Sequence, residues 1–69
     1  MKTFDPGMET LLLRRMETRA EQGRMIGVYQ IGEYYTPEQQ IEEARKGTAA
    51  GEEFLFAEKK LMDELKRRM

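Results

Sequence analysis

The sequence predicts a mainly helical fold of three helices, with one short β-strand between the first and the second helix. Apolar residues recur at helical spacing in three segments, and an aspartate or a threonine stands before each of them as a suitable N-cap. Residues 24–31 form the only segment rich in β-branched and aromatic side chains. Glycines stand at the ends of these segments, where a helix or a strand is expected to stop.

The first helix is expected from about Pro6 to Gln22. Asp5 can accept a hydrogen bond from a backbone N–H of the first turn, and Pro6 fits the first helical position because its missing N–H costs nothing there. Gly23 can take the left-handed conformation that ends a helix. One apolar stripe recurs at four-residue steps: Met8, Leu12, Met16 and Ala20.

The strand is expected from Arg24 to Ile31, before Gly32. Side chains alternate between the two faces of a strand, and here both faces carry apolar groups. One face has Met25, Tyr29 and Ile31, and the other has Ile26 and Val28.

A lone strand leaves its backbone N–H and C=O groups without partners. The segments Lys2–Phe4 and Glu33–Tyr35 are the available partners within the chain, and both are short and weak. We therefore expect the strand to pair with the same strand of a second copy around a two-fold axis, which makes a homodimer.

The second and third helices have clear N-terminal signals. Thr36 and Gln39 fit a capping box, so a helix is expected from Pro37 to about Lys46. Thr48 caps the longest helix, expected from Ala49 to Arg68, in which Gly51 can permit close approach of another backbone. The apolar face of this helix consists of Phe54, Leu55, Ala57, Leu61, Met62 and Leu65.

Two residues break the pattern of the last helix. Glu58 falls on the apolar face, so we expect it to reach solvent at the edge of the core or to pair with a cation. The candidate cations, in this chain or in a neighbouring copy, are Arg15, Arg19 and Arg45. Phe56 falls on the polar side, where it is either incidentally exposed or part of an interface.

Composition excludes several functions. The chain contains no cysteine, histidine or serine, which removes disulfides, imidazole and thiolate metal sites and the common nucleophiles. The glycines match neither a phosphate-binding loop nor a dinucleotide fingerprint. We therefore expect no enzyme activity, no cofactor and no metal.

Length and charge limit the partners. Sixty-nine residues make a single domain, residues 1–69, that needs ideal packing or self-association for stability. Twelve Lys and Arg against 13 Asp and Glu give a net charge of −1, which disfavours nucleic acid as the main partner. No apolar stretch has the length of a signal peptide or membrane span, so we expect a cytoplasmic protein away from membranes.

These observations favour a non-enzymatic protein–protein interaction module that acts as a homo-oligomer, as an adaptor, an inhibitor or an assembly factor. The sequence does not identify the partner protein. The residues expected at interfaces are Met25, Ile26, Val28, Tyr29, Ile31, Phe54, Phe56, Leu61 and Leu65.

The alternative function is DNA binding. From about Arg24 to Met69, the expected order of strand, helix and helix resembles the ribbon-helix-helix repressors, whose dimers lay a two-stranded ribbon in the major groove. The resemblance covers topology only. The ribbon offers Arg24 and Gln30 to base edges and is otherwise apolar, and Glu52 and Glu53 stand where a helix N-terminus would meet a phosphate.

Overall fold

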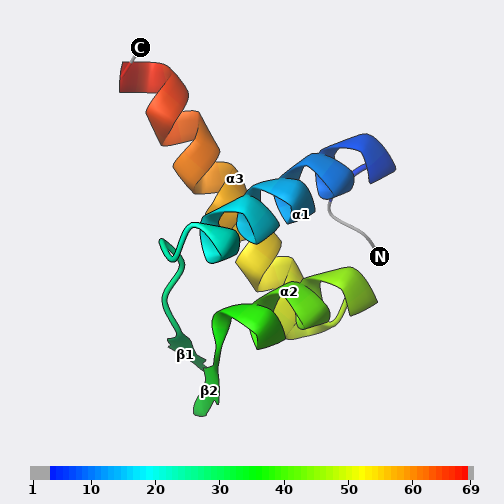
Figure 1. The fold of residues 1–69 in the computed structure, drawn as a ribbon. Coiled ribbons are helices and arrows are strands. Elements are labelled where there is room, and N and C mark those ends of the chain that lie inside the picture. Colours follow the sequence, from blue (N-terminus) through cyan, green and yellow to red (C-terminus); the bar gives the residue numbers. More distant parts are fainter. Residues whose placement is uncertain (1–3, 69) are drawn as a thin grey trace.

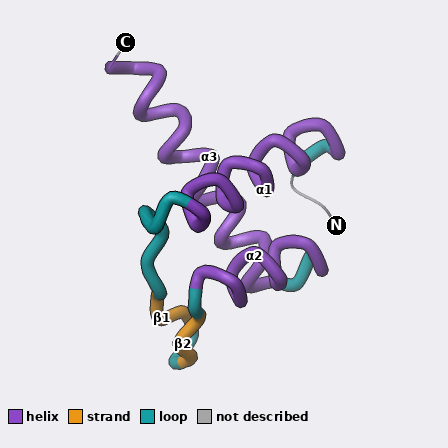
Figure 2. Tube along the Cα trace, viewed as in Figure 1, coloured by secondary structure: helices purple, strands orange, loops and turns teal. Residues whose placement is uncertain are grey.

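The computed structural model describes residues 4–68, and the expected three helices are present in that part of the chain. The mainly helical class is confirmed. The elements follow in the order α1 (Pro6–Glu21), β1 (Val28–Gln30), β2 (Glu33–Tyr35), α2 (Pro37–Lys46) and α3 (Ala49–Arg68) (Figure 1; Figure 2).

The three helices contact one another pairwise. Figure 1 shows α1 and α2 lying across α3, with the C-terminal turns of α3 projecting beyond both of them. The two strands form a small hairpin between α1 and α2 in the chain, and Figure 2 shows it at the edge of the helical body. The fold therefore leaves the hairpin and the end of α3 with few neighbours.

The helix boundaries agree with the local signals. Asp5 accepts a hydrogen bond from the backbone N–H of Met8 at 2.8 Å. Thr36 and Gln39 form both bonds of the capping box, which confirms the start of α2. The first helix ends at Glu21, one residue earlier than expected, with Gln22 as its C-cap.

The core lies between the three helices. Leu12 and Met16 of α1 are almost completely buried, as the four-residue stripe predicts, and Leu55 of α3 is buried to the same degree. Burial of such side chains contributes about 1.5–3 kcal/mol each. The buried apolar residues are Leu12, Met16, Met25, Ile41, Ala44, Ala50, Phe54, Leu55 and Met62.

The turn between α2 and α3 brings two backbones together at Gly51. A methyl group at Gly51 would overlap the backbone carbonyl of Glu43. The side chain of Thr48 accepts a hydrogen bond from the Gly51 N–H at 3.0 Å and caps α3 as expected. Close approach of another backbone at Gly51, one of the uses expected for this glycine, is confirmed.

The expectation of a single strand is wrong. The strand is shorter than predicted, and it pairs antiparallel with β2, in a register that places Val28 opposite Tyr35 and Gln30 opposite Glu33. The weak partner Glu33–Tyr35 is thus the one used. The other candidate, Lys2–Phe4, lies outside the described residues apart from Phe4.

The hairpin changes two arguments drawn from the sequence. One edge of β1 is paired within the chain, so a second copy is not needed to complete that edge. The order after α1 is strand, strand, helix and helix, which differs from the order on which the ribbon-helix-helix resemblance rests.

Candidate functional site

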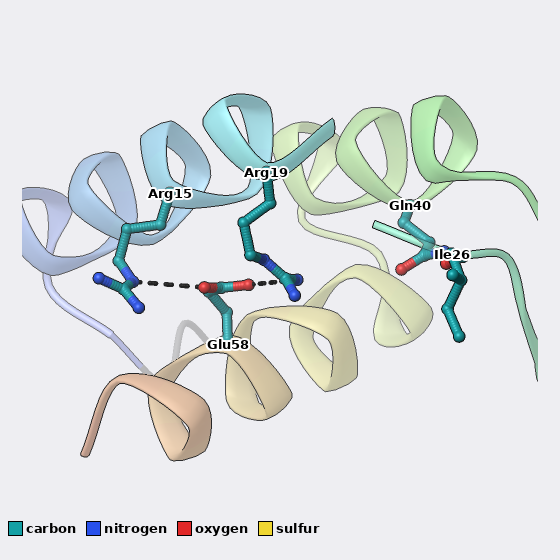
Figure 3. A network of polar contacts seen from close by, with 5 residues as sticks. All are labelled: Arg15, Arg19, Ile26, Gln40 and Glu58. Atoms are coloured by element: carbon teal, nitrogen blue, oxygen red, sulfur yellow. Dashed lines mark hydrogen bonds and ion pairs between the residues drawn. The ribbon is translucent and has the colours of Figure 1, made fainter. Parts of the chain in front are cut away.

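Glu58 joins α1 to α3 in the centre of the molecule. Its side chain is 1% exposed, and its carboxylate lies between two arginines that project from successive turns of α1 (Figure 3). Arg15 Nε donates a hydrogen bond to Oε2 at 3.3 Å, and Arg19 Nη2 lies 2.7 Å from Oε1. Glu58 was expected either to reach solvent or to pair with a cation, and the structure shows that it is buried and paired.

The contact of Arg19 with Glu58 is an ion pair without an aligned hydrogen bond. Oε1 of Glu58 and Nε of Arg19 are both buried, and neither has a hydrogen-bond partner in the described part of the chain. An unpartnered buried polar atom typically costs about 1–3 kcal/mol. The charges of Arg19 and Glu58 are therefore paired, although Nε of Arg19 and Oε1 of Glu58 make no hydrogen bond with the described residues.

Arg45, the third cation considered for Glu58, pairs elsewhere. Its guanidinium forms an ion pair with Glu17 that links α2 to α1 at the surface. Two of the three expected partners are thus brought to Glu58, because Arg15 and Arg19 are four residues apart and share one face of α1.

A second buried polar residue, Gln40, ties the hairpin to the helices. Its side-chain Nε2 donates to the carbonyl oxygens of Ile26 at 3.0 Å and Tyr35 at 3.2 Å. Sequence reasoning missed this role. The available signal is spacing, because Gln40 shares a helix face with Ile41 and Ala44, which are both buried.

The hairpin and the loop before it carry the three most exposed large apolar side chains of the described residues, Ile26, Tyr29 and Ile31. The hairpin cluster is defined as Ile26, Tyr29, Ile31 and Tyr34, which are 76%, 78%, 84% and 52% exposed. The rings of Tyr29 and Tyr34 pack across the strands with their centroids 5.2 Å apart. Val28 and Tyr35 face the helical body instead, and Tyr35 meets Phe54 edge-on.

Ile31 occupies an unusual conformation at the tip of the hairpin. Its φ is 51°, and the φ of the following Gly32 is 76°. Positive φ at both central residues is the pattern of a type I′ turn, which normally uses Asn-Gly or Gly-Gly. A β-branched residue in this region costs about 1–2 kcal/mol relative to its ordinary conformation.

A groove runs between the hairpin and α3. The hairpin groove has a volume of about 670 Å³ and is lined by residues of every helix and of β1. Apolar and charged residues both line it, since Ile26 and Tyr29 are among its lining residues together with Arg19 and Glu58.

A second groove, the arginine groove, adjoins the first and has a volume of about 590 Å³. It is formed by α1, the residues just after it and the C-terminal half of α3. Arg19, Arg24 and Leu61 line both grooves, so these three residues lie between the two. Leu61 and Leu65, expected at an interface, are thus brought to the same groove.

The remaining expected interface residues separate into two groups. Met25 and Phe54 are buried in the core of this chain and are removed from the candidate surface. Phe56 is 54% exposed and packs against Phe4 with ring centroids 5.5 Å apart. Phe56 therefore lies apart from the hairpin cluster, because it contacts a residue that precedes the N-terminus of α1, whereas the hairpin follows the C-terminus of α1.

Comparisons with protein-family models, curated proteins and solved structures found no match. Within residues 4–68, none of the helices has the length and hydropathy needed to cross a membrane. The same residues hold no group of three or more acidic side chains placed to bind a metal ion.

Proposed function

We propose that this chain is a non-enzymatic protein–protein interaction module that self-associates through the hairpin cluster. The observation that carries the proposal is Ile31. It is 84% exposed, and it adopts a positive φ that a β-branched residue tolerates poorly. Such a side chain contributes almost no burial within its own chain, so its free-energy cost is explained when a partner covers it.

The neighbours of Ile31 support the same surface. Ile26, Tyr29 and Tyr34 place further aliphatic and aromatic area beside it, and tyrosines are common in protein interfaces. Gln40 of α2 attaches the hairpin to the helices, because its side chain donates hydrogen bonds to the carbonyl oxygens of Ile26 and Tyr35. A surface that is already ordered loses less conformational entropy on binding.

The proposed partner is a second copy. A two-stranded hairpin leaves the outer edge of each strand unpaired, and pairing of like edges around a two-fold axis would extend the sheet and bring the two clusters side by side. The proposal keeps the homodimer expected from the sequence and moves it to an outer edge of the hairpin. The absence of histidine, cysteine and serine supports a non-enzymatic role, and a cytoplasmic location remains part of the proposal.

Sedimentation equilibrium over a range of concentrations tests the proposal. We expect the wild-type chain to be a dimer and Ile31→Asn to be a monomer, because Asn suits the turn but removes the apolar contact. Phe56→Ser is the matched control, since it also removes an exposed apolar side chain but lies away from the hairpin. A wild-type monomer at high concentration, or a dimer unaffected by Ile31→Asn, overturns the proposal.

A further inference from the structure

The arginine groove concentrates positive charge in a chain whose net charge is −1. Four arginines line it, Arg14, Arg15, Arg19 and Arg24, and the described residues that line it include no acidic side chain. A separate groove between α1 and α2 is lined by four acidic residues, Glu17, Glu21, Glu38 and Glu42, and by one cation, Arg45. The net charge of −1 therefore does not reveal that the arginine groove is basic and that this separate groove is mainly acidic.

Most of this positive charge is not neutralised by residues 4–68, the part of the chain that the structure describes. Arg15 and Arg19 share the single carboxylate of Glu58. Arg14 and Arg24 are exposed and form no ion pair among the described residues, and Arg24 donates only to the neutral side chain of Gln22 at 3.1 Å. Four arginines against one carboxylate leave three positive charges at the groove.

Apolar side chains line the same groove. Leu11 of α1 and Leu65 of α3 are 44% and 46% exposed, and Leu61 lies one turn before Leu65. A ligand that carried charge alone would leave these leucines in water. A ligand with an apolar face between acidic flanks matches both features of the groove.

The surrounding helices favour a helical ligand. The C-terminal turns of α3 project beyond α2, and α1, which crosses α3, supplies the other wall of this groove (Figure 1). A third helix placed there would pack between two existing helices, as an amphipathic helix does in a preformed groove. Arg15 and Arg19 are held on one side of the groove by Glu58 and are therefore prepositioned for carboxylates.

We propose that the arginine groove binds an acidic amphipathic helix of a partner protein. The inference rests on the proposed function in treating the chain as an interaction module, and it assigns the partner's chemistry to a different surface from the hairpin cluster. Nucleic acid is the weaker occupant, because phosphates would use the arginines and leave Leu11 and Leu65 uncovered.

The test uses the full chain and a short synthetic helix with leucines on one face and glutamates on the flanks. Fluorescence anisotropy at low salt should detect binding, and amide shifts in NMR spectra should map to Leu11, Leu61 and Leu65. Arg14→Glu combined with Arg24→Glu should weaken binding about tenfold or more, since each reversal replaces attraction by repulsion. Both side chains are exposed and neither forms an ion pair with another described residue, so the variant should keep its helical circular dichroism.

Lys46→Glu combined with Lys60→Glu is the matched control, because it makes the same change in net charge at residues that do not line the groove. This control should retain most of the affinity. A second peptide, with lysines in place of the glutamates, should not bind, and a DNA duplex should bind more weakly than the acidic peptide.

Several outcomes overturn the inference: no binding of the acidic peptide, equal binding of the lysine peptide, equal loss in both double variants, or tighter binding of duplex DNA. The hairpin variant Ile31→Asn separates this inference from the proposed function. Dimerisation tests the hairpin proposal, and peptide binding tests the arginine groove. If the wild type stays a monomer and Ile31→Asn still binds the peptide, the hairpin proposal fails and the inference about the arginine groove stands. Dimerisation without peptide binding gives the reverse result.

Discussion

Oε1 of Glu58 lies 2.7 Å from Nη2 of Arg19, at a point where the glutamate side chain is 1% exposed and the arginine side chain is 28% exposed. The two groups therefore differ in their dependence on each other. The guanidinium can reach water, whereas the carboxylate depends on Arg15 and Arg19 to balance its charge. This asymmetry decides which substitutions in the network should destabilise the fold.

Removing both arginines should cost more than the sum of the single changes. Arg15→Gln or Arg19→Gln alone leaves Glu58 with one cation, and we expect a loss of about 1 kcal/mol for each, discounted because both arginines are partly exposed. The double variant leaves an uncompensated buried carboxylate and should lose about 3 kcal/mol or more. Urea unfolding followed by circular dichroism measures these differences.

Glu58→Gln provides the control for this network. Added to the double variant, it removes the buried charge and should restore part of the lost stability, although it destabilises the wild-type chain. Strictly additive losses, or no recovery on adding Glu58→Gln, would show that the charge of Glu58 is not balanced by these arginines.

Gly51→Ala should destabilise the fold although alanine is the better helix former. A methyl group at this position overlaps the backbone carbonyl of Glu43, which cannot move without separating α2 from α3. Overpacking of this kind typically costs about 1–3 kcal/mol. Gly7→Ala is the control, because a methyl group there meets only the flexible side chain of Asp5 at 3.4 Å.

Thermal unfolding compares the two glycine variants. Gly7→Ala should be neutral or slightly stabilising, by up to about 1 kcal/mol. Equal melting temperatures for Gly51→Ala and the wild type would contradict the close approach of the two helices.

The helices could be predicted from the sequence because their signals are local. Asp5, Thr36 and Thr48 each accept a hydrogen bond from a backbone N–H three residues later, so the N-termini are specified by neighbouring residues. The apolar stripe containing Leu12 and Met16 is equally local, and both residues are buried.

The hairpin could not be predicted because its turn lacks the usual residues. Gly32 suits a positive φ, but Ile31 does not, and Ile-Gly is a poor signal for a type I′ turn. The second strand has only three residues and begins with Glu33. Its pairing is supported by Gln40, whose contacts depend on the packing of α2 against the loop before β1.

The arginine groove could be predicted only in part. Arg14, Arg15, Arg19 and Arg24 are close in the sequence, but glutamates separate them and hide the cluster in the charge balance. Burial of Glu58 and the crossing of α3 over α1 determine which of these charges face the same groove, and neither is a local property.

Gln40→Met should loosen the hairpin more than the helices. The substitution keeps the length of the side chain but leaves the carbonyls of Ile26 and Tyr35 without their donor, a loss of about 1–3 kcal/mol. Hydrogen exchange should become faster at the amides of the hairpin than at those of α3. Gln30→Met, which changes a residue of β1 without these bonds, is the control, and equal exchange in both variants would contradict the role of Gln40.

Asp63 should remain ionised at lower pH than an ordinary aspartate. Lys59 donates to both carboxylate oxygens, at 2.9 and 2.7 Å, and lowers the pKa of Asp63. Because the pKa is lower in the folded chain, this contribution to stability is present above the unfolded pKa of about 3.9 and is lost as the pH falls through the folded pKa. The pKa of Asp63 can be measured from its carboxyl carbon chemical shift during an acid titration, and it should return to the ordinary aspartate range in Lys59→Met.

Tyr35 should resist deprotonation in alkaline solution. Its hydroxyl donates to Glu33 Oε2 at 3.1 Å, and this hydrogen bond raises the pKa of the phenol. Since the folded chain favours the protonated form, the contribution to stability is complete below the unfolded pKa of about 10 and is lost as the pH rises through the folded pKa. Ultraviolet titration should show a late phenolate component that disappears in Tyr35→Phe and shifts to lower pH in Glu33→Gln. A late component that persists in Tyr35→Phe would assign the raised pKa to another tyrosine.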